Sequence, residues 1–296
     1  MTMAQWWQPD WGYLGLEIGV SLALFTLLRF SQGWWEGVSS QQELADRDNV
    51  AFGISTSGSL LAMAMVISGI LPRTGAAGYL EQGLSLACFG LSGLLLIRIS
   101  LWVNDRFAID RIEKKAQILA GNLAMALTDA SAAIAAALVV RALLQQLTPA
   151  PSFMAFISYA LLYLASLALL TVISHGIQWL HNRRSYGPFQ QAIGQDQRSV
   201  ALNHSGIILA SAMVMANAIP LTDGNIHRPL LLLWQWLSTS LVGLMILVLW
   251  QRLLSAWVML KINPDKEIAL QDNGGIAALA AAQWIGVAWL LDAIMN

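Results

Sequence analysis

One polar signature occurs four times along this chain, at intervals of 73 to 77 residues. In each copy a short charged segment leads into an apolar run, which begins with an amide or hydroxyl residue and has Ala or Gly two positions later. The aligned polar residues are Asn49, Asn122, Ser199 and Asn273. A regular repeat of this length indicates one supersecondary unit per copy, with neighbouring units stacked on one another. We therefore expect four similar units in chain order.

Composition places these units in a membrane. Of the 296 residues, 57% are hydrophobic and 11% are charged, whereas a soluble domain carries about 25% charged residues. Eight apolar runs come close to the ~20 residues that a bilayer-spanning helix needs. They cover roughly 11–30, 49–71, 79–103, 116–140, 152–174, 199–222, 229–251 and 273–291. The predicted fold class is all-α: a polytopic membrane protein with eight transmembrane helices, arranged as four helical hairpins with parallel internal repeats.

The turn near 142–151 is the predicted boundary between two larger units. It contains Pro149 and Pro151, which favour a turn over a continuing helix. The first four-helix membrane unit then covers 1–148, and the second covers 149–296. Each unit has an even number of spans, so both insert in the same direction.

The distribution of Lys and Arg predicts the orientation of the spans. Twelve of these residues follow the first, third, fifth and seventh predicted helices, and three lie in the opposite loops. Because loops rich in Lys and Arg stay in the cytoplasm, the first set is expected there and both termini are expected outside.

Small residues are concentrated in the second helix of each predicted hairpin, as in 53–59 and 274–281. Small side chains let membrane helices approach closely, so these even-numbered spans are expected to make the inner contacts. The odd-numbered spans are rich in Leu, Phe and Trp and should face lipid. The repeated polar residues have two interpretations: each caps its own helix or bonds a neighbouring turn, or the four surround a central cytoplasmic vestibule.

The charged turn followed by Asn-x-Ala-x-Gly at 49–53, or Asn-x-Ala-x-Ala at 122–126, resembles the YjfL-type family of uncharacterised bacterial inner-membrane proteins. Members of that family usually have one four-helix unit, so the resemblance implies a tandem duplication here. Ser199 in place of Asn and the Gly274-Gly275 pair depart from the pattern. The resemblance implies a multi-pass protein of the bacterial inner (plasma) membrane. In that membrane, the Lys and Arg distribution makes both termini periplasmic. The resemblance implies no activity.

Ionisable side chains inside the apolar runs are the main functional candidates, because a charge at membrane depth is costly unless it is paired or hydrated. Asp129 lies about eleven residues inside the fourth predicted helix, or roughly 16 Å deep at 1.5 Å per residue. It is expected either to bind a proton or cation in a polar cavity, or to bond a neighbouring helix, with pairing to Arg98 as a further alternative. Glu17 lies nearer the outer face and is a weaker candidate.

A second polar cluster is centred on His204, about one turn into the sixth predicted helix. A single His here is more typical of hydrogen bonding than of metal binding, since no second ligand stands at helical spacing. Motifs of known enzymes are absent from the sequence. We therefore expect no metal site, no cofactor and no enzymatic activity. The predicted polar path consists of Asp129, Glu17, Ser55, Ser57, Thr128, Asn203 and His204.

Two classes of function follow. In the first, protons, ions or a small solute pass through this polar path between the repeats. In the second, the protein is a non-transporting membrane anchor or scaffold, whose charged cytoplasmic connections recruit a partner. The net charge of −1 argues against nucleic-acid binding. The lipid bilayer is the expected partner, while assembly into homo-oligomers and binding of a cytoplasmic protein both stay open.

Overall fold

The computed structural model describes residues 11–71, 78–146, 152–184, 186–222 and 227–295. Within these ranges it contains eight helices that are long and apolar enough to cross a membrane, as the sequence predicts. They are α1 (Trp11–Glu36), α2 (Val50–Ile70), α3 (Tyr79–Val103), α5 (Leu123–Gln146), α6 (Phe153–Arg183), α8 (Arg198–Asn217), α9 (Pro229–Val258) and α11 (Gly274–Met295). The described residues form no strand, which confirms the all-α fold class.

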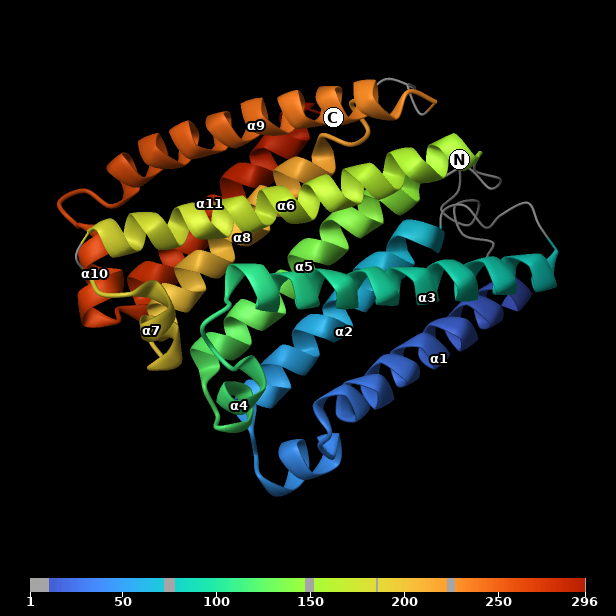
Figure 1. Ribbon diagram of the computed structural model, residues 1–296, viewed down its shortest axis with the longest axis horizontal. Helices are drawn as coiled ribbons and strands as arrows, with labels where there is room; N and C mark the ends of the chain where they lie inside the picture. Colours follow the sequence, from blue (N-terminus) through green and yellow to red (C-terminus); the bar gives the residue numbers. More distant parts are fainter. Residues whose placement is uncertain (1–10, 72–77, 147–151, 185, 223–226, 296) are drawn as a thin grey trace, which may run out of the picture.

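The long helices form two layers (Figure 1). One layer, the inner row, consists of α2, α5, α8 and α11, and each of these helices packs along most of the next one in chain order. The other layer consists of α1, α3, α6 and α9, which lie across the inner row. α2 and α11 are at opposite ends of the inner row. The repeats are therefore arranged side by side in an open row.

Small side chains allow the close approach within the inner row. A Cβ atom added to Gly58 of α2 would lie 2.4 Å from the Cβ of Ala130 on α5. At the other end of the row, a Cβ atom added to Gly206 of α8 would lie 2.6 Å from the Cβ of Ala281 on α11. These contacts confirm that the even-numbered spans are the inner ones.

The outer helices expose more of their apolar surface. α1, α3, α6 and α9 bury a smaller share of their residues than the inner helices do. Trp102, Trp179 and Trp257 are largely exposed, as is expected for side chains that face lipid or its headgroups. The outer layer has its own polar link, because the Tyr163 hydroxyl on α6 donates a hydrogen bond to the Leu96 carbonyl oxygen on α3 at 2.6 Å.

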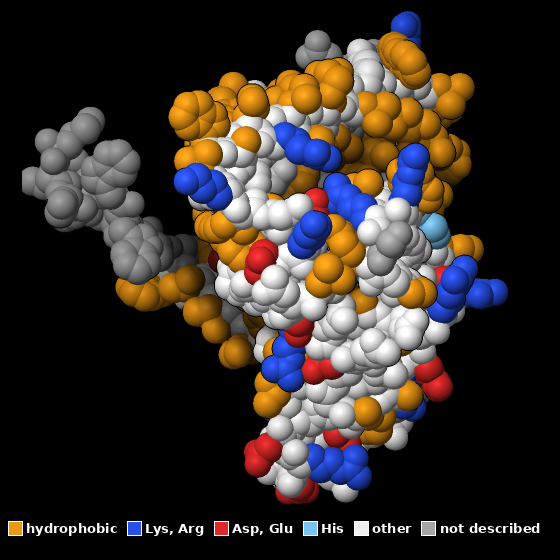
Figure 2. Space-filling model, turned by 90° about the vertical axis from the view of Figure 1, so that its left-hand side faces the viewer, with side chains coloured by type: hydrophobic (Ala, Val, Ile, Leu, Met, Phe, Trp, Pro, Cys, Tyr) orange, Lys and Arg blue, Asp and Glu red, His pale blue; other side chains and the backbone are white. Residues whose placement is uncertain are grey.

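Five short helical segments at one end of the molecule join the two long helices within each hairpin. They are the π-helical turns η2 (Gln42–Asp46) and η4 (Asn104–Ala108) and the α-helices α4 (Lys114–Leu119), α7 (Phe189–Gly194) and α10 (Pro264–Gln271). We call this end the connection end. Figure 2 looks onto it, and charged side chains of both signs are spread over its face.

The start predicted for the fourth span, residue 116, is wrong. Residues 114–119 form the separate helix α4, and the backbone turns after it at Gly121, where φ is +86°. The span itself, α5, begins at Leu123. Asp129 is therefore only six residues into its helix, or about 9 Å from the helix start, and lies nearer the connection end than the sequence predicted.

The predicted division at 148/149 falls among residues 147–151, which lie outside the described residues. α5 and α8, from the two sides of this division, pack closely together. One apolar core includes Met63 from the first side and Met215 from the second. The two four-helix units stay a prediction.

Candidate functional site

The inner helices all begin with the same backbone turn. Each turn has one residue with positive φ, followed directly by an amide residue. The positive-φ residues are Asp48, Gly121, Asp196 and Asp272. The amide residues that follow them are Asn49, Asn122, Gln197 and Asn273. Ser199, which the sequence aligned with the three Asn residues, is instead the second residue of α8, and Gln197 occupies the N-cap position.

Three of these turns bond the turn of the next repeat. The Asn49 side-chain amide donates to the carbonyl oxygen of Ile118 at 3.1 Å, and the Asn122 amide donates to that of Ile193 at 2.9 Å. In the third repeat the Ser199 hydroxyl donates to the Ile268 carbonyl oxygen, also at 2.9 Å. The carbonyl groups that accept these bonds belong to α4, α7 and α10. The bonds therefore attach each connecting helix to the preceding inner helix.

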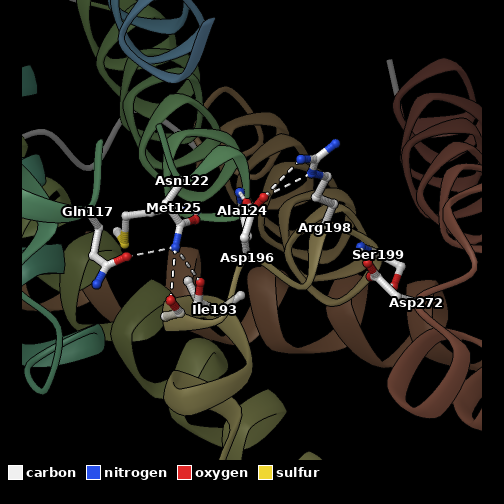
Figure 3. A network of polar contacts seen from close by, with 10 residues as sticks. Gln117, Asn122, Ala124, Met125, Ile193, Asp196, Arg198, Ser199 and Asp272 are labelled. Atoms are coloured by element: carbon white, nitrogen blue, oxygen red, sulfur yellow. Dashed lines mark hydrogen bonds and ion pairs between the residues drawn. The ribbon is translucent and has the colours of Figure 1, made fainter. Parts of the chain in front are cut away.

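Two Asp side chains make the reverse link (Figure 3). Asp196 accepts a hydrogen bond from the backbone N–H of Ala124 at 2.8 Å, and Asp272 accepts one from that of Ser199 at 2.9 Å. Both N–H groups lie in the first turn of an inner helix, where no partner exists within the helix itself. Gly121 is the positive-φ residue of the second turn, and it has no side chain that could accept a hydrogen bond from the first turn of α2. The repeated polar residues are thus linked in series from one repeat to the next.

Asp129 is the most buried member of a cluster of charged side chains. Its carboxylate accepts hydrogen bonds from the Ser55 hydroxyl on α2 and from Lys114 Nζ on α4, the latter at 2.9 Å. Lys114 also forms an ion pair with Asp105. The exposed fraction of Asp129 is 4%. We call Asp105, Lys114 and Asp129 the charge cluster.

The charge cluster has a net charge of −1 when all three groups are ionised. Burial by itself lowers the pKa of Lys114, but the carboxylates of Asp129 and Asp105 raise it more, so its pKa lies above the ordinary lysine value. Lys114 is therefore positively charged at neutral pH. Asp105 Oδ1 is buried and accepts no hydrogen bond from any described residue. The cluster could bind one further proton or monovalent cation through this oxygen.

The third repeat has different residues at the two equivalent positions. Counting 75 residues on from Lys114 and Asp129 leads to Phe189 and His204. Phe189 begins α7 as Lys114 begins α4, and its ring centroid lies 5.2 Å from that of His204. His204 is 2% exposed, and its Nε2 shares a hydrogen bond with the Ser174 hydroxyl at 3.1 Å. An ion pair in the second repeat is thus replaced by two packed rings in the third.

The other residues of the predicted path are distributed over the molecule. Glu17 lies near the opposite end, where it accepts a hydrogen bond from Gln82 at 2.7 Å. Ser57 is exposed, and the Thr128 hydroxyl bonds the carbonyl oxygen of Ala124 in its own helix. Asn203 lines a cavity together with His204. The structure brings Ser55 to Asp129 and Asn203 to His204, but the described residues do not join the whole set into one path.

Two members of the charge cluster were missed in the sequence, where Arg98 was considered as the partner of Asp129. Arg98 instead approaches the Ser31 hydroxyl, at 3.5 Å. The sequence does contain one indication of the contact between Lys114 and Asp129. Gly121 interrupts the helix between these two residues, so the segment that carries Lys114 can fold back against the start of α5. Among the described residues, no three His, Cys, Asp or Glu side chains are grouped to hold a metal ion.

Comparison with known proteins identifies one family, described as Domain of Unknown Function (DUF350). It matches the chain three times, over residues 6–144, 77–219 and 144–295. Each match covers two hairpins, and each begins one hairpin after the previous one. No curated protein and no solved structure matches the chain.

Proposed function

Because the chain belongs to the family described as Domain of Unknown Function (DUF350), for which no activity is given, we propose its function from the charge cluster. In this proposal the protein passes protons or monovalent cations across the membrane, and the charge cluster binds them on the way. The observation that carries the proposal is the buried Asp105 oxygen without a hydrogen-bond donor in the described part of the chain.

Electrostatics supports a cation as the ligand of the charge cluster. Two carboxylates share one ammonium group, so a single positive charge brings the cluster to neutrality. An uncompensated charge is costly in a medium of low dielectric constant, and buried ionisable groups within membrane spans mark ion and proton pathways. Ser55 and Lys114 keep Asp129 in a fixed position while the second carboxylate, Asp105, is available for the incoming cation.

A non-transporting scaffold is the second candidate. It is favoured by the bonds that hold α4, α7 and α10 to the inner row, because they keep a charged surface in a fixed shape at the connection end. Exposed residues on this surface, such as Arg111 and Glu113, could then recruit a cytoplasmic protein.

Flux measurements in liposomes distinguish these two functions. Asp129→Asn and Asp105→Asn each remove one carboxylate and should slow proton or monovalent-cation flux at least about tenfold, the effect of a 1.4 kcal/mol loss in ion binding. Glu113→Gln is the matched control, since this exposed carboxylate belongs to the same connection. All variants are compared at equal incorporation. Wild-type flux no faster than that of protein-free liposomes would end the transport proposal and leave the scaffold.

The location of the protein is also part of the proposal. We place it in the bacterial inner membrane as a YjfL-type protein with two four-helix units in tandem. The excess of Lys and Arg near the connection end supports a cytoplasmic connection end and periplasmic termini. The chain has one cysteine, Cys88, which is exposed. With Cys88 replaced by Ser, labelling of single cysteines introduced at Glu113 and at Tyr79, from either side of intact inner-membrane vesicles, tests this orientation.

A further inference from the structure

A cavity of about 350 Å³ lies at the connection end, between the third and fourth repeats. Its walls come from α6, α8, α9, α10 and α11. The volume is within the range of sites that hold small molecules. This cavity is separate from the charge cluster, whose residues do not line it.

The cavity has charged side chains at its mouth, and its interior combines apolar side chains with polar ones such as Asn203 and His204. Arg184, at the end of α6, and Asp265, at the start of α10, form an ion pair where the cavity opens. Ile207 and Trp284 lie two or more turns into their helices and line its inner part. An amphiphilic ligand, with a charged head and a hydrocarbon chain, matches this distribution.

A buried imidazole lines the cavity without a full set of partners. His204 Nε2 is bonded to the Ser174 hydroxyl, but the buried His204 Nδ1 has no hydrogen-bond partner among the described residues. When Nε2 accepts the hydroxyl proton, Nδ1 carries the hydrogen and is a donor. A buried donor without an acceptor is unfavourable, so an oxygen atom of a ligand would be stabilising here.

The basic side chains at the mouth indicate a negatively charged head. Arg252 is exposed and lines the cavity, and it forms no ion pair within the described ranges. Arg184 forms an ion pair with Asp265, and a phosphate group could take the place of that carboxylate. Arginine binds phosphate through two parallel, charge-assisted hydrogen bonds. Basic pockets between membrane helices are typical sites for lipid phosphates.

We propose that this cavity binds a phosphate-bearing amphiphile. The phosphate lies between Arg184 and Arg252, and the hydrocarbon chain lies against Ile207 and Trp284. In the second repeat, the position of Phe189 and His204 is filled by the ion pair of the charge cluster.

The test uses the full chain in micelles of dodecyl maltoside, a detergent without phosphate, to which either phosphatidic acid or inorganic phosphate is added. Thermal unfolding is followed while each source of phosphate is titrated. A rise in the unfolding midpoint with phosphatidic acid alone identifies a lipid ligand. The same rise with inorganic phosphate identifies the free anion or a soluble phosphate ester. Both results support a phosphate site, and no rise with either one overturns it.

Two variants separate phosphate binding from the structural effect of the ion pair. Arg184→Gln and Asp265→Asn both remove the ion pair. The first also removes the guanidinium group that would bind phosphate, whereas the second removes the carboxylate that competes with phosphate for Arg184. Arg184→Gln should require about tenfold more phosphatidic acid for the same shift, and Asp265→Asn should require less. Arg183→Gln is the control, because Arg183 is exposed outside the cavity beside Trp179. The proposal is overturned if both variants change the titration in the same direction.

Discussion

Asp196 caps an inner helix of the preceding repeat: its Oδ1 accepts a hydrogen bond from the backbone N–H of Ala124 at 2.8 Å. Asp196 itself is in the left-handed region, with φ of +59°, at the turn before α8. The same relationship recurs between Asp272 and Ser199. The side chain that completes the start of each of these helices is therefore supplied by another hairpin.

Asp196→Gly should lower the free energy of unfolding by about 1 kcal/mol, the usual effect of losing a helix cap. Gly tolerates the positive φ of this position, as Gly121 does in the second repeat, so the change removes the carboxylate without straining the backbone. The measurement is denaturant unfolding in detergent micelles. Asp48→Gly is the matched control, because Asp48 has the same backbone conformation and no preceding repeat to cap. Equal losses in the two variants would show that the cap is unimportant.

Gly58→Ala should destabilise the protein by about 1–3 kcal/mol, the range for overpacked interiors. The added methyl group would lie within 3 Å of both the Cα and the Cβ of Ala130, so α2 and α5 would have to move apart. Gly206→Ala should have a similar effect on the contact of α8 with Ala281.

Gly286→Ala is the control for both of these changes. An added Cβ atom there has no neighbour within 4 Å, and Ala favours a helix over Gly by roughly 1 kcal/mol. Its unfolding midpoint should be equal to or above that of the wild type. A loss at Gly286 as large as that at Gly58 would contradict close packing as the cause.

Lys114→Gln should lower the free energy of unfolding by about 3 kcal/mol, because it leaves the buried carboxylate of Asp129 without its cation. Lys115→Gln should change it by no more than about 0.5 kcal/mol, since Lys115 is exposed. The neighbouring pair of variants is measured by denaturant unfolding at neutral pH. Equal stability of the two variants would contradict a stabilising role for the ion pair between Lys114 and Asp129.

The contribution of Lys114 should also depend on pH. Its pKa is raised above the ordinary value of 10.5 in the folded protein, so the folded chain holds this proton more tightly than the unfolded chain does. Its contribution to stability is complete below the unfolded pKa and is lost as the pH rises through the folded pKa. Above that ordinary value, the unfolding midpoint of the wild type should therefore fall more steeply than that of Lys114→Gln. Parallel slopes for the two proteins would contradict the raised pKa.

The sequence predicted the spans well because a membrane span needs a long apolar run, and such a run can be recognised from the residue types alone. It also predicted which helices lie inside, since small residues such as Gly58 and Ala281 mark close contacts. The start of α5 was missed because Ile118 and Leu119 extend the apolar run, whereas the backbone turns at Gly121. That single turn changed the inferred depth of Asp129.

The candidate site was less accessible to sequence reasoning because its contacts join distant segments. Lys114 reaches Asp129 only because α4 folds back beside α5, and no spacing rule for a continuous helix predicts this pair. Gln197 was passed over in favour of Ser199, since a Gln does not resemble the Asn of the other turns. The positive φ of Asp196 reveals the correct register.

The hydrogen bonds between successive turns also constrain how the protein is made. During synthesis, the carbonyl group that accepts the hydrogen bond of Asn49 is made about seventy residues after Asn49. The Asp196 carboxylate likewise follows Ala124, which it caps, by about seventy residues. Each of the first three hairpins thus enters the membrane before these bonds can form, and the arrival of the next hairpin completes them. During biogenesis, each newly inserted hairpin then stabilises the hairpin that was inserted before it.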